Sequence, residues 1–170
     1  MSKQSLKRDN CQLARIAIEE SKKFYHGNMP GVSSNLHPLI ECFPFPNTET
    51  LDNWDYVWCG AFVYHCVRLF DYDLPVHYPD KRISGNFAGV LSWMQWAKLP
   101  EVNKWVDAKE EPMLGDIVLL QQFCNIDFPD HMGIVTDISQ EFLEDAEGNF
   151  NNMTAMVKRD YKNVFGYIRL

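Results

Sequence analysis

Hydrophobic residues recur every three or four positions in the first part of the chain, and this spacing predicts helices. The first predicted helix covers residues 10–25 and ends at the turn residues that follow. Its apolar stripe is formed by Leu13, Ile16, Ala17 and Phe24. The charged residues of this segment are expected on the outward face, namely Glu19, Glu20, Lys22 and Lys23.

Two further segments show the same helical spacing. The second predicted helix covers residues 58–70, and its apolar positions place Cys59 on the buried face. The third covers residues 86–99, although Gly89 weakens it. Between the first two helices, residues 33–54 contain three prolines and are predicted to form an irregular loop that covers a site or packs as a cap.

After Pro112 the pattern changes to short apolar runs that are typical of strands. The predicted strands cover residues 117–120, 131–138, 141–147, 154–158 and 165–169. Helices therefore come first and strands follow. This order predicts an α+β fold in which N-terminal helices pack against a C-terminal antiparallel β-sheet.

Composition and charge narrow the class of protein. The chain has 170 residues, of which 46% are hydrophobic and 23% are charged, as expected for one soluble domain. A net charge of −7 argues against nucleic acid or an anionic membrane as a partner, and the Lys81-Arg82 and Lys158-Arg159 pairs are too short to form a basic surface. No apolar run reaches transmembrane length.

The N-terminal residues and the cysteines indicate the compartment. Residues 1–10 are polar and lack the apolar segment of a signal peptide, so we expect a protein that is cytoplasmic as synthesised. The five cysteines are scattered and odd in number, which favours a reducing compartment over a disulfide framework. A zinc site at His65 and Cys66 is disfavoured because no second ligand pair accompanies them, and we expect no metal or organic cofactor.

Cys59 stands where a polar loop turns into the second predicted helix. The first N–H groups of a helix are unpaired and carry the positive end of its dipole, which favours a thiolate there. The thiolate is the nucleophilic form of cysteine, so this is a suitable place for a catalytic thiol. The alternative is that Cys59 merely begins a core helix, because buried free cysteines are often inert.

A nucleophilic cysteine needs an imidazole to take its proton and a third group to orient that imidazole. His131 begins a predicted strand and is the candidate base, although a surface histidine at a turn is the alternative. The third group is suggested by Glu147-Gly148-Asn149 at the end of another strand. Either the Glu147 carboxylate or the Asn149 amide can accept from an imidazole, but the same three residues also form a good turn.

Taken together, these motifs resemble the CHAP family, the cysteine- and histidine-dependent amidohydrolases and peptidases of the papain-like and NlpC-like group. In chain order, the matching motifs are Trp58-Cys59-Gly60-Ala61-Phe62-Val63, Leu114-Gly115-Asp116-Ile117-Val118, His131-Met132-Gly133-Ile134-Val135, Glu147-Gly148-Asn149 and Gly166-Tyr167-Ile168-Arg169. Each motif alone is weak, but five in the family's order are fairly specific. The family often has proline where this chain has Leu114.

The resemblance implies a single papain-like catalytic domain over residues 1–170. Residues 54–170 would form its motif-bearing core, and residues 1–53 a variable helical and loop part. It also implies that Cys59 is the nucleophile and His131 the base, with Glu147 or Asn149 orienting the imidazole. Family members commonly cleave amide bonds in peptidoglycan, as N-acetylmuramoyl-L-alanine amidases or as endopeptidases.

Other expectations follow from the same residues. Tyr56 and Trp58, next to Cys59, are candidates for the oxyanion site or for substrate contact, and both are equally suited to packing. Without a signal peptide, such an enzyme would be a lysin that is released to the cell wall or an effector that is delivered to it. A delivered toxin would have a proteinaceous inhibitor as a second partner. The alternatives are a catalytically silent module that binds cell wall or peptides, and an intracellular thiol amidase acting on a small peptide conjugate.

Overall fold

The computed structural model describes residues 9–43, 58–74, 80–122 and 127–170. Within these residues it contains four α-helices and one six-stranded antiparallel sheet, so the predicted α+β class is confirmed. The helices are α1 (Asn10–Ser21), α2 (His37–Ile40), α3 (Cys59–Leu69) and α4 (Val90–Ala97). The strands are β1 (Trp105–Asp107), β2 (Ile117–Leu120), β3 (His131–Ile138), β4 (Phe142–Phe150), β5 (Met153–Asp160) and β6 (Val164–Ile168), and the 3₁₀ helix η2 (Tyr161–Asn163) precedes β6.

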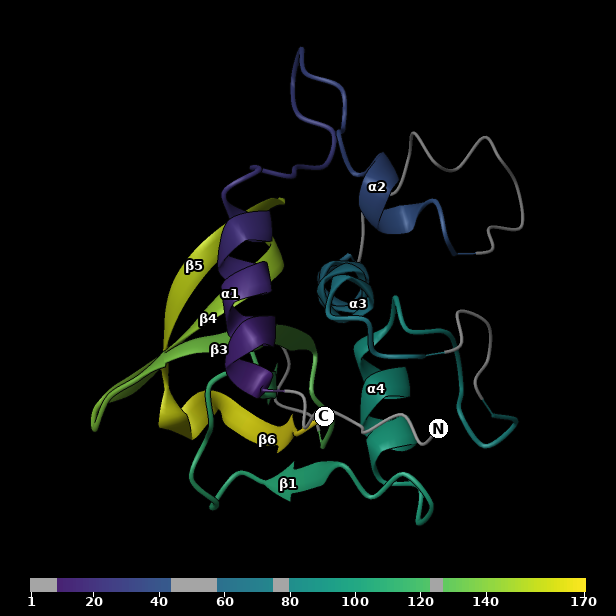
Figure 1. Cartoon of the computed structure of the whole chain (residues 1–170). Coiled ribbons are helices and arrows are strands. Elements are labelled where there is room, and N and C mark those ends of the chain that lie inside the picture. Colours follow the sequence, from purple (N-terminus) through teal and green to yellow (C-terminus); the bar gives the residue numbers. More distant parts are fainter. Residues whose placement is uncertain (1–8, 44–57, 75–79, 123–126) are drawn as a thin grey trace, which may run out of the picture.

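The strands are arranged in the order β1-β6-β2-β3-β4-β5, which makes β3 and β4 internal and leaves β1 and β5 at the edges. Helices α1 and α3 pack against β3 and β4 (Figure 1). The pairing of β3 with β4 places Gly133 opposite Glu147 and Val135 opposite Asp145. The start of β3 therefore lies next to the end of β4, and both are near α3.

Apolar side chains form two clusters because successive residues of a strand point to opposite faces of the sheet. The larger cluster joins the helices to one face, and its strand residues are Ile117, Leu119, Met132, Ile134, Ala146 and Ile168. The smaller cluster contains Val118, Leu120, Val135, Leu143 and Tyr167. By the same alternation, His131, Asp145 and Glu147 share the face of this smaller cluster.

The first helix is shorter than predicted, and the burial of some of its residues differs from the prediction. It ends at Ser21, whose hydroxyl donates to the carbonyl of Ile18 at 2.8 Å. Phe24 follows with a left-handed φ of 52° and is 71% exposed, so it does not extend the apolar stripe as predicted.

Glu20 is buried, contrary to its predicted outward position. The Tyr25 hydroxyl donates to its carboxylate at 3.0 Å, and His65 of α3 lies 3.1 Å from the same carboxylate oxygen. Lys23 adds an ion pair of 2.8 Å. These partners compensate the buried charge, which the spacing of α1 alone does not reveal.

The remaining elements follow the predictions with few differences. All five predicted strands are present, and α3 lies within the predicted helix 58–70. Helix α4 is shorter than predicted because Gly89 forms its N-cap. The predicted loop 33–54 contains the short helix α2, and its part after residue 43 lies outside the described residues. Strand β1 was missed because three residues carry no alternation pattern.

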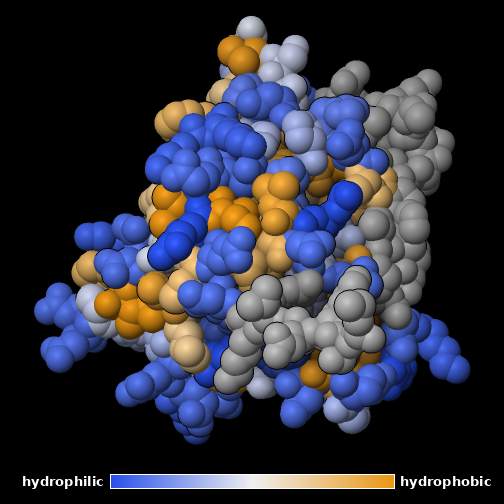
Figure 2. Space-filling model, in the orientation of Figure 1, coloured by the Kyte–Doolittle hydropathy of each residue, from blue (hydrophilic) through white to orange (hydrophobic). Residues whose placement is uncertain are grey.

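None of the described helices combines the length and the apolar character needed to span a membrane. The face shown in Figure 2 is mostly hydrophilic, with apolar side chains gathered in its middle.

Candidate active site

Helix α3 places Cys59 at its first residue, as predicted. Trp58 is the N-cap, and its side chain makes no capping hydrogen bond. The glycine after the thiol lets the helix start approach its neighbour closely, because a Cβ at Gly60 would collide with the carbonyl oxygen of Ala88. Cys59 is therefore held at a tightly packed helix start that the N-cap side chain leaves uncapped.

Strands β3 and β4 bring His131 and Glu147 together. Nε2 of His131 lies 2.6 Å from Oε2 of Glu147, and both side chains are buried. His131 also forms a hydrogen bond with the Cys59 thiol. Since Nε2 is bound to Glu147, Nδ1 is the nitrogen that remains for Cys59. The structure thus joins three of the predicted site residues in the order Cys59, His131, Glu147.

The charges of the site favour a protonated imidazole. Burial acts to lower the pKa of His131, but hydrogen bonds with Cys59 and Glu147 outweigh it and raise this pKa to about 9. Burial likewise acts to raise the pKa of Glu147, but hydrogen bonds from His131 and Arg159 hold it below its usual value. An ionised Glu147 accepts a hydrogen bond only, so Nε2 of His131 is the donor in this pair.

Arg159 of β5 holds both oxygens of Glu147. Its Nε donates to Oε1 at 2.6 Å and its Nη2 donates to Oε2 at 2.7 Å. The same Nη2 also donates to Oε1 of Gln122 at 2.7 Å. This two-pronged contact fixes the plane of the carboxylate that faces His131.

Asp145 is a second buried carboxyl group beside Glu147. It lies two residues earlier on β4, on the same face, and is fully buried. Gly133 of β3 makes room for the pair, because a Cβ there would collide with Oδ2 of Asp145 and would lie 2.9 Å from Cγ of Glu147. The glycine of the His131-Met132-Gly133 motif is therefore required by packing.

The other predicted site residues have different positions. Asn149 lies in the irregular region between Glu147 and Phe150, has a left-handed φ of 60° and is partly exposed. Trp58 is fully buried with its ring against Gly148, and its indole N–H has no partner among the described residues. Tyr56 lies outside the described residues.

The protonation of His131 predicts how stability depends on pH. Its pKa in the folded protein, about 9, is above the ordinary value of 6.5, so proton binding stabilises the fold. This contribution is complete below pH 6.5 and is lost as the pH rises through 9. Between these values we expect the free energy of urea unfolding to fall with pH more steeply in the wild type than in His131→Gln. Parallel pH dependences in the two proteins would contradict the assignment.

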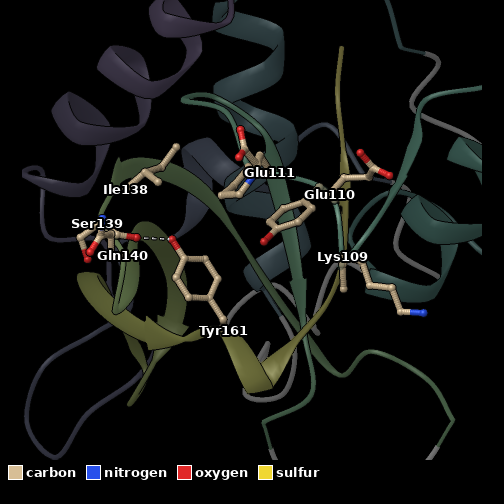
Figure 3. Close-up of a pocket in the computed structure, with 10 residues that line it drawn as sticks. Lys109, Glu110, Glu111, Ile138, Ser139, Gln140 and Tyr161 are labelled. Atoms are coloured by element: carbon tan, nitrogen blue, oxygen red, sulfur yellow. Dashed lines mark hydrogen bonds between the residues drawn. The ribbon is translucent and has the colours of Figure 1, made fainter.

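A pocket of about 640 Å³ lies at the other end of β3 from His131 (Figure 3). It is lined by the turn between β3 and β4, the loop between β1 and β2, and two tyrosines. Its Tyr161 hydroxyl donates to the carbonyl oxygen of Ser139 at 2.7 Å. Because Ser139 follows the last residue of β3 and His131 is the first, this pocket is separate from the thiol site.

Sequence reasoning missed Arg159, Gln122 and Asp145. In the sequence Arg159 belongs to a short basic pair with Lys158, although a buried acidic residue such as Glu147 requires a cation or donor nearby. No local pattern indicates which cation it is. His65, considered for zinc, instead contacts Glu20. Within the described residues, no group of three or more His, Cys, Asp or Glu side chains is placed to hold a metal ion.

Comparison with known proteins gives no match: no family model, no curated protein and no solved structure is similar to the chain.

Proposed function

We propose that this protein is a cysteine hydrolase of amide bonds with a papain-like fold and that it belongs to the CHAP family. The observation that carries this proposal is the contact of Cys59 with His131 and of His131 with Glu147 at 2.6 Å. A thiol at a helix start, an imidazole and an orienting carboxylate are the groups that nucleophilic amide hydrolysis requires. The order of the five motifs along the chain supports the family assignment.

In the proposed mechanism, the proton of the Cys59 thiol resides on His131 before the reaction, and the sulfur of the resulting thiolate attacks the carbonyl carbon. N–H groups at the start of α3, which the N-cap side chain of Trp58 leaves uncapped, stabilise the oxyanion. The C–N bond then breaks, and His131 donates the proton to the leaving amine. Water, deprotonated by His131, hydrolyses the thioester and restores the Cys59 thiolate beside protonated His131. Glu147 keeps the imidazole in the orientation and protonation state that each step needs.

Peptidoglycan is the proposed substrate because the motifs resemble those of enzymes that cleave its amide bonds. The nucleophile is 1% exposed, so a substrate carbonyl reaches the sulfur only when the surrounding side chains move apart.

The test is to incubate purified peptidoglycan with the protein and to identify the released ends by mass spectrometry. We expect either free lactyl groups with N-terminal alanine, from an amidase, or new peptide termini, from an endopeptidase. Cys59→Ala is the matched control and should release none. Absence of new ends with the wild type on peptidoglycans of several peptide compositions would reject this substrate class.

The orienting residue gives a further prediction. Glu147→Gln should reduce turnover by about two orders of magnitude, the scale for loss of one positioned catalytic group. It should also lower the pKa of His131, since an amide does not stabilise the imidazolium as a carboxylate does. Asn149→Ala should reduce turnover less, because Asn149 lies in the irregular region after the carboxylate.

The measurement is the pH–rate profile of both variants beside the wild type. The Asn149→Ala protein serves as the control for disturbance of this strand end. If Glu147→Gln keeps its rate and profile while Asn149→Ala loses activity, the orienting group is the amide and the assignment is wrong.

A further inference from the structure

The carboxyl group of Asp145 is buried, and a buried polar group needs a hydrogen-bond partner. Its carboxyl group is fully buried, and neither oxygen meets a hydrogen-bond donor among the described residues. Its polar neighbour is the Glu147 carboxyl group, which lies within hydrogen-bonding reach but is itself an acceptor when ionised. Two carboxyl groups in contact form a hydrogen bond only if one of them carries a proton.

The neighbouring cations are already engaged by Glu147. Arg159 donates two hydrogen bonds to the Glu147 carboxylate and a third to Gln122. His131 donates to Glu147 from Nε2. These donors therefore stabilise the negative charge on Glu147. A second negative charge on Asp145 would be buried without a donor, which costs far more free energy than keeping the proton on Asp145.

We propose that Asp145 retains its proton and donates it to the Glu147 carboxylate, acting as a positioning residue for the Cys59–His131–Glu147 site. The pair then carries one negative charge, held by hydrogen bonds from His131, Arg159 and Asp145. As a consequence, Glu147 has three donors around it and little tendency to take the imidazole proton itself. The catalytic meaning of this arrangement rests on the proposed function, but the protonation of Asp145 does not.

Two further observations agree with this assignment. Burial and the adjacent Glu147 charge raise the pKa of Asp145 well above its usual range. Gly133 provides the space in which the two carboxyl groups meet, since a Cβ there would collide with Oδ2 of Asp145. A larger residue at position 133 would force the pair apart.

The experiment is infrared spectroscopy of the protein in D₂O at neutral pH, where a retained proton gives a carboxylic-acid C=O band. We expect this band in the wild type and its loss in Asp145→Asn. Glu144→Gln, which changes the adjacent, partly exposed carboxylate of β4, is the matched control and should leave the band unchanged. Absence of the band in the wild type, or its persistence in Asp145→Asn, would overturn the proposal.

A second readout follows the His131 ring by NMR during a pH titration. Asn keeps a donor at this position and no charge, so the His131 pKa in Asp145→Asn should agree with the wild type to within about 0.3 unit. If Asp145 were ionised, the same variant would remove a nearby negative charge and lower that pKa by about one unit or more. Both readouts are independent of hydrolysis, so an inactive wild type would reject the proposed function while leaving this test valid.

If the protein is active, its turnover distinguishes a positioning role of Asp145 from a role in packing alone. Asp145→Asn should stay within about threefold of the wild type, whereas Asp145→Leu should lose roughly tenfold or more, as outer hydrogen-bond partners of functional histidines do in metal sites. Equal losses of turnover in both variants would show that turnover does not depend on the hydrogen bond from position 145. If Asp145→Leu fails to fold, the Asn variant and the two spectroscopic readouts still decide the question.

Discussion

Replacement of Cys59 or His131 by alanine is expected to abolish the proposed amide hydrolysis and to leave the fold intact. Each change removes a member of one chemical unit, so each should cost at least about 10⁴-fold in kcat. The double variant should be no worse than either single variant, because the thiol has no base without His131 and the imidazole has no nucleophile without Cys59. Circular dichroism and urea unfolding establish that the variants remain folded.

Iodoacetamide labelling provides a check that needs no substrate. Cys59 should be modified before the other described cysteines, and its rate should fall in His131→Ala. Cys66→Ala is the matched control, because Cys66 is buried on the same helix and burial raises the pKa of its thiol. Activity near wild type in Cys59→Ala or His131→Ala, or preferential labelling of Cys11, Cys42 or Cys66, would count against the mechanism.

Replacement of Arg159 by leucine is expected to cost about 3 kcal/mol of folding free energy, the lower end for breaking a buried ion pair, because His131 still contacts Glu147. The loss arises because Glu147 is fully buried and would keep its charge without the two hydrogen bonds from Arg159. Arg159→Lys should lose less, since lysine keeps the charge but not the planar fork. Turnover should fall in both, because the carboxylate that contacts His131 becomes mobile.

Urea unfolding at neutral pH measures this effect. Lys158→Leu is the control: the neighbouring side chain is exposed and lies 4.4 Å from the centre of the Phe142 ring, so its loss should cost about 1 kcal/mol or less. An Arg159→Leu protein as stable as the wild type would show that Glu147 does not depend on this cation.

Much of the fold and part of the site could be predicted from local patterns. The three- and four-residue spacing from residue 58 places Cys59 at the start of a buried helix, which the structure confirms. The apolar run that begins at His131 places this residue at the start of a strand, which is also confirmed. These predictions succeed because a helix or strand buries one face, and that requirement repeats at a fixed interval along the chain.

The contacts among the site residues could not be predicted from the sequence, because they join residues that are distant in the chain. The pairing of β3 with β4 puts Glu147 opposite Gly133 and thus beside His131, and the pairing of β4 with β5 brings Arg159 within reach of Glu147. A register shift of one residue would turn these side chains to the other face, so no local pattern could select them.

The burial of polar residues also could not be predicted from local patterns. Glu20 was predicted to face outward, and aspartate is a residue type that is mostly exposed in proteins, yet Glu20 and Asp145 are both buried. Glu20 is stabilised by partners that include His65 of another helix, and Asp145 lies in a space left by Gly133 of another strand. The sequence alone therefore determined which elements carry Cys59 and His131. Only the tertiary structure decided which buried groups hold them, because burying a polar group becomes favourable only once its partners from other elements are in place.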